Sequence, residues 1–147
     1  MGLDDQIRDV ADELEIRNLL ARLAQLADDG ELEEYIELFT EDAVWEGAAF
    51  GQRRGRASLL EGARERRGSG VAGPGTNTRH VITTVAIRLG GDTAKSRSVF
   101  HYYTNTQAEP VLAIMGIYED RFQRTPSGWK LAHRKISGPA PAPSEAQ

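Results

Sequence analysis

The chain has 147 residues, 39% of them apolar, and a formal net charge of −4, which suits a single folded domain with its own core. The acidic balance argues against a nucleic-acid-binding domain, which gathers Lys and Arg on one face. The absence of cysteine excludes disulfides and thiolate metal sites. The first residues show no signal-peptide pattern, and no apolar run reaches the ~18 residues of a membrane span, so we expect a soluble, cytoplasmic protein.

A long helix is predicted for the first thirty residues, ending at Gly30. Apolar residues recur there at helical spacing in two sets, Leu3, Ile7, Val10 and Leu14, then Ile16, Leu19, Leu20, Leu23 and Leu26. Because the two sets lie on different sides of the helix, we expect it to contact the core on more than one side.

Two further helices are predicted before the β-rich half of the chain. The stretch "ELEEYIELF" is the second helix, "DAVWEG" is a first strand, and "SLLEGARERR" is the third helix. The densest basic run of the chain, Arg64, Arg66 and Arg67, shares this third helix with glutamates. We interpret the run as a solvated face.

The second half of the chain reads as four long strands. A glycine-rich loop, "RGSGVAGPGTNT", leads into them and matches neither phosphate-binding glycine pattern. The strand-like runs cover residues 78–89, 93–105, 110–124 and 129–136, separated by turns at "GGD", "QAEP" and "TPSG". They predict a meander within one domain of residues 1–137, followed by a disordered Pro-, Ala- and Ser-rich tail at residues 138–147.

Both faces of these strands are apolar by simple alternation. In "HVITTVAIRL" the odd positions and the even positions each carry apolar or β-branched residues, and "VLAIMGIYEDRF" repeats this. An antiparallel sheet normally exposes one face to water. Because both faces are apolar here, we expect helices to cover one side and a partner subunit the other. The prediction is a homo-oligomer, a dimer or trimer, through the outer sheet face.

Helices followed by long antiparallel strands predict an α+β fold, a cone-shaped curved antiparallel sheet covered by three N-terminal helices around a pocket. The stretches "EIRNLLARLAQLADDGELEEYIELFTEDAVWEG", "RGRASL", "TRHVITTVAI" and "GIYEDRFQRTPSGWKLAHRKI" together resemble the SnoaL-like family of the nuclear transport factor 2-like superfamily. The resemblance covers about residues 5–137. The superfamily includes scytalone dehydratase, ketosteroid isomerase and polyketide cyclases, so the fold does not decide the chemistry.

The resemblance implies a catalytic pair, Asp28 and His80. Dehydratase-like members place an aspartate at the end of the first helix and a histidine early in a central strand, and these two residues stand at those positions. A carboxylate that accepts from one ring nitrogen stabilises the imidazolium and leaves the other nitrogen to take a proton. A solvated aspartate before a glycine and a histidine buried in a core remain the alternatives.

One position departs from the family pattern. Dehydratase-like members often carry a tyrosine or lysine five residues before the aspartate, and this chain has Leu23. Candidates to replace that acid are tyrosines, namely Tyr35, Tyr102, Tyr103 and Tyr118; we expect Tyr35, Tyr102 and Tyr118, with Trp45, to contact the substrate. His101 and His133 belong to no ligand motif, so we expect neither a metal nor another cofactor.

These residues predict a cofactor-independent lyase or isomerase, dehydratase-like, for a hydrophobic cyclic molecule of polyketide or steroid type. Two alternatives stay open: a small-molecule binding protein without turnover and a polyketide cyclase. We expect no nucleic-acid or membrane partner.

Overall fold

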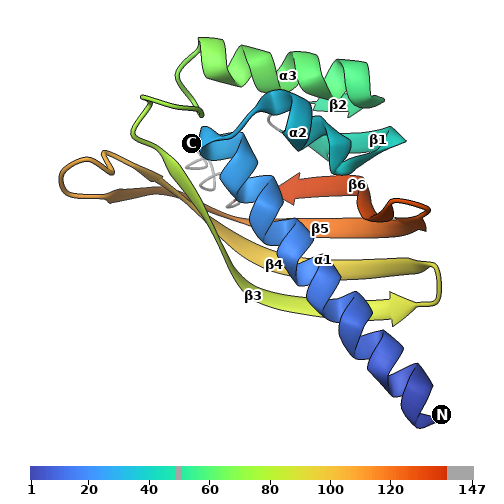
Figure 1. Cartoon of the computed structure of the whole chain (residues 1–147). Helices are drawn as coiled ribbons and strands as arrows, with labels where there is room; N and C mark the ends of the chain where they lie inside the picture. Colours follow the sequence, from blue (N-terminus) through green and yellow to red (C-terminus); the bar gives the residue numbers. More distant parts are fainter. Residues whose placement is uncertain (49–50, 139–147) are drawn as a thin grey trace, which may run out of the picture.

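The computed structural model describes residues 1–48 and 51–138, which form three helices and one sheet of six strands (Figure 1). The helices are α1 (Leu3–Asp29), α2 (Leu32–Glu37) and α3 (Arg56–Gly68). The strands are β1 (Phe39–Gly47), β2 (Gly51–Arg54), β3 (Arg79–Gly90), β4 (Thr93–Thr104), β5 (Val111–Thr125) and β6 (Gly128–Ser137). The predicted α+β class is confirmed, and β2 is the element that the sequence pattern missed. Of the predicted tail, residues 139–147 lie outside the described residues.

The sheet has the strand order β2-β1-β6-β5-β4-β3. Strands β3 to β6 form the predicted meander of antiparallel neighbours. Strand β1 pairs parallel with β6, with Trp45 opposite Arg134, so the sheet is mixed. The predicted antiparallel pairing holds for every other pair of neighbouring strands. The direction of a strand depends on where the chain returns to the sheet, which the alternation of side chains within that strand does not report.

Helix α1 crosses one face of the sheet, and its apolar contacts with the core come from its second half. Figure 1 shows its N-terminal turns continuing past the ends of the strands. The second apolar set is buried there, from Ile16 to Leu23, whereas the first set, Leu3, Ile7, Val10 and Leu14, is 57–70% exposed. The predicted two-sided contact was therefore wrong. No helix within residues 1–48 and 51–138 is long and apolar enough to cross a membrane.

A β-bulge in β3 changes which residues face the helices. The pairing of β3 with β4 shifts by one residue between Thr83 and Ala86, and Thr84 has a positive φ of 44°. One extra residue reverses the alternation, so the inward residues are even-numbered before the bulge and odd-numbered after it. The apolar residues of β3 therefore share the inner face, apart from Val81 and Ala86. The prediction of two apolar faces was wrong for this strand.

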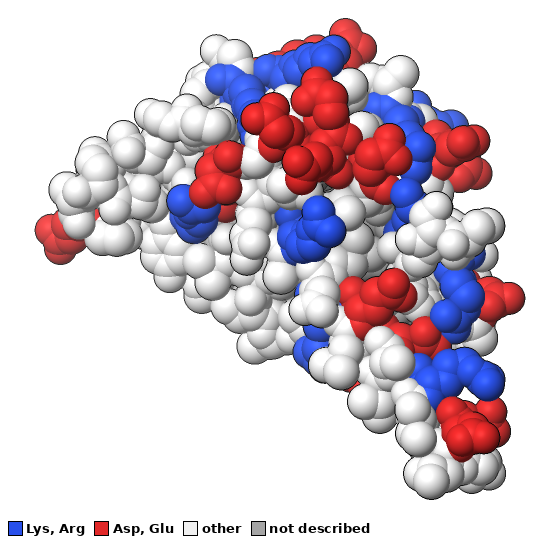
Figure 2. Space-filling view, in the orientation of Figure 1, with Lys and Arg blue, Asp and Glu red and all other residues white. Residues whose placement is uncertain are grey.

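The outer face of the sheet is charged in its middle and apolar at one end. Glu119 of β5 lies between Arg97 of β4 and Lys135 of β6, so neighbouring strands present opposite charges there. Exposed apolar residues gather instead at the hairpin that joins β4 to β5, and they are Val111, Leu112 and Met115. The neighbouring Ile114 is also exposed, but it lines the cavity on the inner face. Figure 2 shows few charged side chains at this end of the molecule.

Candidate functional site

A cavity of about 440 Å³ lies between the helices and the inner face of the sheet. Its wall is mainly apolar and comes from every layer of the fold, with Leu23 and Ala27 on α1, Ile82 on β3 and Phe100 on β4. Leu23, which stands where dehydratase-like relatives carry an acid, is 1% exposed and lines this cavity. The cavity wall therefore has an apolar side chain at the position where those relatives have an acid.

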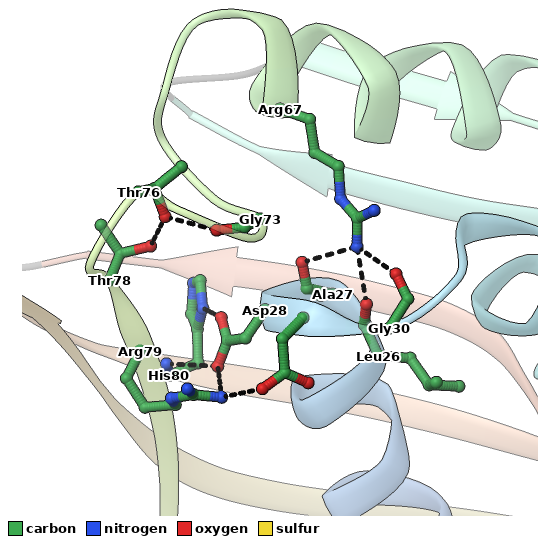
Figure 3. A network of polar contacts seen from close by, with 11 residues as sticks. Leu26, Ala27, Asp28, Gly30, Arg67, Gly73, Thr76, Thr78, Arg79 and His80 are labelled. Carbon is green, nitrogen blue, oxygen red and sulfur yellow. Dashed lines mark hydrogen bonds and ion pairs between the residues drawn. The ribbon is translucent and has the colours of Figure 1, made fainter.

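The structure brings Asp28 and His80 into direct contact. Asp28 Oδ1 lies 2.7 Å from His80 Nδ1, and Asp28 Oδ2 accepts the backbone N–H of His80 at 2.8 Å (Figure 3). Because the carboxylate faces Nδ1, that nitrogen carries the proton in the neutral ring and Nε2 is left as the acceptor. His80 lines the cavity, while Asp28 behind it is 2% exposed.

The end of α1 that carries Asp28 is held by arginines on both sides. Arg67 of α3 donates from Nη2 to the carbonyls of Leu26 at 3.0 Å and Gly30 at 2.6 Å (Figure 3). The Leu26 carbonyl also accepts the N–H of Gly30 at 3.0 Å. Arg79 donates to Asp29 at 2.8 Å and lies 4.0 Å from Asp28. A carboxylate opposes the helix dipole at this end, and these cations offset that cost.

The four predicted substrate-contacting residues, Tyr35, Trp45, Tyr102 and Tyr118, all line the cavity. The hydroxyl of Tyr102 donates to the carbonyl of Val71 at 2.6 Å, which ties the glycine-rich loop to the sheet. Its ring centroid lies 5.0 Å from that of His80. Tyr102 therefore forms part of the cavity wall and holds the glycine-rich loop in place. Tyr103, by contrast, pairs with His101 at 3.3 Å away from the cavity lining.

Tyr118 is buried, with 7% of its surface exposed, as is Tyr35 with 5%. The Tyr118 ring stacks on Phe100 with centroids 4.3 Å apart, and burial raises the pKa of the Tyr118 hydroxyl to about 12. Among the described residues no partner lies within hydrogen-bond distance of that hydroxyl. It is therefore a protonated donor at neutral pH.

Two arginines of the cavity wall were missed by the sequence analysis, Arg134 and Arg66. Arg134 is 6% exposed; it donates from Nε and Nη2 to Asp120, each at 2.9 Å, and its guanidinium carbon lies 3.7 Å from the centre of the Tyr118 ring. No pattern in β6 marks it. For Arg66 a signal exists, because it follows the buried positions Leu59 and Ala63 at helical spacing. The prediction that its basic run is a solvated face was wrong for Arg66 and Arg67.

The described residues contain no group of three His, Asp or Glu side chains placed to hold a metal ion. The cavity offers one histidine held by a buried carboxylate, the hydroxyls of Tyr35 and Tyr118, for which the described residues supply no hydrogen-bond partner, and two arginines in an otherwise apolar wall. This combination can take a proton from carbon and stabilise the oxygen that gains charge.

The fold defines the class of protein: helices covering a curved, mixed sheet with a cavity between them, as in cystatin-like, NTF2-like folds. The chain belongs to the SnoaL-like domain family, whose model matches residues 8–135. The resemblance seen in the sequence is thereby confirmed.

Similar proteins support this assignment. An uncharacterized protein of Mycobacterium tuberculosis is 28% identical over 130 residues, which cover 87% of this chain and 86% of that protein. The crystal structure of an NTF2-like protein with a cystatin-like fold from Novosphingobium aromaticivorans matches with a TM-score of 0.79 at 26% identity, covering 96% of this chain and 90% of the other. A candidate dehydratase of the NTF2-like family from Streptomyces avermitilis has a TM-score of 0.75 at 16% identity, covering 89% and 98% of the two chains. At that identity it shows the fold alone.

Proposed function

We propose that this chain is a cofactor-independent lyase or isomerase that removes a proton next to a carbonyl group of a hydrophobic cyclic substrate. The observation that carries the proposal is the 2.7 Å contact between His80 Nδ1 and a carboxylate that is itself out of reach of the cavity. A histidine in this setting has one nitrogen occupied and one nitrogen available to substrate. The fold shared with a candidate dehydratase is consistent with this chemistry.

The proposed reaction starts at His80 Nε2. This nitrogen takes the α-proton, the C–H electron pair forms an enolate, and Asp28 stabilises the imidazolium. In a dehydration the enolate electrons then expel a β-hydroxyl group, which takes the proton from His80 and leaves as water. In an isomerisation the same proton returns to a different carbon. Both reactions share the first step.

The enolate oxygen needs a donor, and Leu23 cannot be one. We assign this role to the hydroxyl of Tyr118, because it lines the cavity, stays protonated at neutral pH and has no partner among the described residues. Tyr35, which also lines the cavity, is the second candidate. Tyr102 is a poorer one, because its hydroxyl proton is already given to Val71.

Hydrogen exchange in D₂O tests the shared first step without a known product. A panel of bicyclic and steroid ketones is incubated with the protein, and deuterium uptake at the α-carbon is followed by mass spectrometry. We expect uptake with the wild-type protein and a loss of about 10²–10⁴-fold in His80→Ala, with ketone binding retained. Ketones that bind in the cavity without any exchange would instead identify a binding protein without turnover, the principal alternative.

A second copy of the chain is the partner we propose, through the outer sheet face at the hairpin end. Val81 and Met115 flank His101 on that face and are 39% and 50% exposed. The charged middle of the face, around Glu119, is the less suitable part. Sedimentation tests this: we expect the wild-type protein to be dimeric or trimeric at micromolar concentration and Met115→Glu to be monomeric, with Glu119→Gln as control. A monomeric wild-type protein contradicts the proposal.

A further inference from the structure

Three of the four arginines of α3 differ in their surroundings, and one of them faces the cavity with no counter-ion among the described residues. Arg64 is on the solvent side, where its guanidinium lies 3.6 Å from Glu33. Arg67 donates to backbone carbonyls at the end of α1. Arg66 lines the cavity with its guanidinium carbon 4.7 Å from the centre of the Trp45 ring.

The charge of Arg66 is not balanced locally. Within residues 1–48 and 51–138, no Asp or Glu lies within ion-pair distance of its guanidinium, and no Asp or Glu lines the cavity. The other arginine of the wall, Arg134, uses two of its nitrogens on Asp120 and is thereby neutralised. The cavity is thus electropositive at Arg66, although the chain as a whole carries a net charge of −4.

An arginine in this position suits a planar anion. Its side chain lies on an aromatic ring, which restricts its rotamers, and the fork of N–H groups matches both oxygens of a carboxylate. A hydrogen bond to a charged partner contributes on the order of 10- to 100-fold in affinity, against about 2- to 10-fold for a neutral one. Because the surrounding wall is apolar, a charged group bound there competes with little water.

We propose that the cavity binds a hydrophobic carboxylate, an aromatic or alicyclic acid whose carboxylate lies on Arg66 and whose rings contact Trp45 and the apolar wall. That this ligand is the substrate rests on the proposed function. If it is, the substrate of that reaction is a carboxylic acid. Arg66 comes from α3 and His80 from β3, so the group that holds the charge and the group that takes the proton are separate.

The test compares two ligands of nearly the same size and shape, the anion naphthalene-2-carboxylate and the neutral naphthalene-2-carboxamide, by calorimetry at fixed ionic strength. We expect the wild-type protein to bind the carboxylate at least about tenfold more tightly than the carboxamide. Arg66→Met keeps the apolar stem over Trp45 and should abolish this preference while binding the carboxamide normally. Arg66→Lys should keep part of the preference. Arg64→Met, on the solvent side of the same helix, is the matched control and should keep all of it.

Two results overturn the proposal: equal affinities for the two ligands in the wild-type protein, or a preference that persists in Arg66→Met. Unchanged carboxamide binding in Arg66→Met shows that the cavity is intact, which separates loss of charge recognition from misfolding. The proposed function fails or holds independently, because His80→Ala should retain the preference for the carboxylate while losing deuterium exchange. If the wild-type protein prefers the carboxylate but catalyses no deuterium exchange in the ketones, the carboxylate-binding inference holds and the proposed catalytic function fails.

Discussion

Two aspartates of α1, Asp12 and Asp28, are each buried against a nitrogen-containing side chain of the sheet. They differ in what lies on the far side of that side chain. Asp12, 8% exposed, accepts from Arg124 at 2.7 and 2.8 Å and from the indole of Trp129 at 3.0 Å. Neither Asp12 nor Arg124 lines the cavity. Asp28 holds a histidine whose second nitrogen remains available next to a cavity.

The contrast shows that a buried ion pair is not by itself a functional site. The Asp12 cluster is closed, because its carboxylate binds only groups of the protein, so it can contribute to stability alone. The Asp28 pair is open on one side, where His80 lines the mainly apolar cavity. An available nitrogen and a cavity, rather than burial, distinguish the two.

The largest expected effect is on activity at the open pair. Asp28→Asn and His80→Ala should each lower α-proton exchange by about 10²–10⁴-fold, because the base loses either its orientation or its nitrogen. If the two residues act as a unit, the double variant should be little slower than either single one. Rates from deuterium uptake give the comparison. Strictly additive losses would assign the residues separate roles.

The closed cluster should respond in stability instead. Asp12→Ala removes the acceptor of the buried Trp129 N–H, and an unsatisfied buried donor costs about 1–3 kcal/mol of unfolding free energy. Urea unfolding measures the loss, and Asp12→Asn, which keeps an acceptor oxygen, is the control with the smaller loss. Deuterium exchange should be unchanged in both. An Asp12 variant as inactive as Asp28→Asn would remove the distinction between the two regions.

Acid should weaken the closed cluster in a predictable direction. Hydrogen bonds from Arg124 lower the pKa of Asp12 below that of an ordinary aspartate, against the opposing effect of burial. A carboxyl whose pKa is lower in the folded state than in the unfolded state stabilises the protein at any pH above its unfolded-state pKa. This contribution is lost as the pH falls through the folded-state pKa. Unfolding free energies from about pH 5 down to about pH 2 should therefore fall less steeply in Asp12→Asn. Parallel curves for the two proteins contradict this prediction.

The smallest effect is expected from the C-terminal tail. Residues 139–147 follow Gly138, which lines the cavity, and their sequence "PAPAPSEAQ" has no large apolar residue to bury. Removing them should change neither the melting temperature nor the affinity for naphthalene-2-carboxylate. A clear drop in either would show that the tail binds to the domain and that the cavity site includes residues beyond those described.

The sequence predicted most of the elements and part of the site. Helix α1, the meander from β3 to β6 and the α+β class follow from periodicity and turn residues, which are local. The resemblance to a family paired Asp28 with His80, residues that are 52 positions apart. Arg66 could have been found from the buried face of α3, whereas nothing in β6 distinguishes Arg134 from its neighbours.

By itself the sequence determined where helices and strands form, because side-chain periodicity acts over a few residues. Only the tertiary structure decided which side chains meet. The extra residue at the bulge near Thr84 places His80 and the later apolar residues of β3 on one face, and a single shift of this kind reverses every position after it. The cavity, the free charge of Arg66 and the open nitrogen of His80 exist because elements distant in the chain leave space between them, and packing alone sets that space.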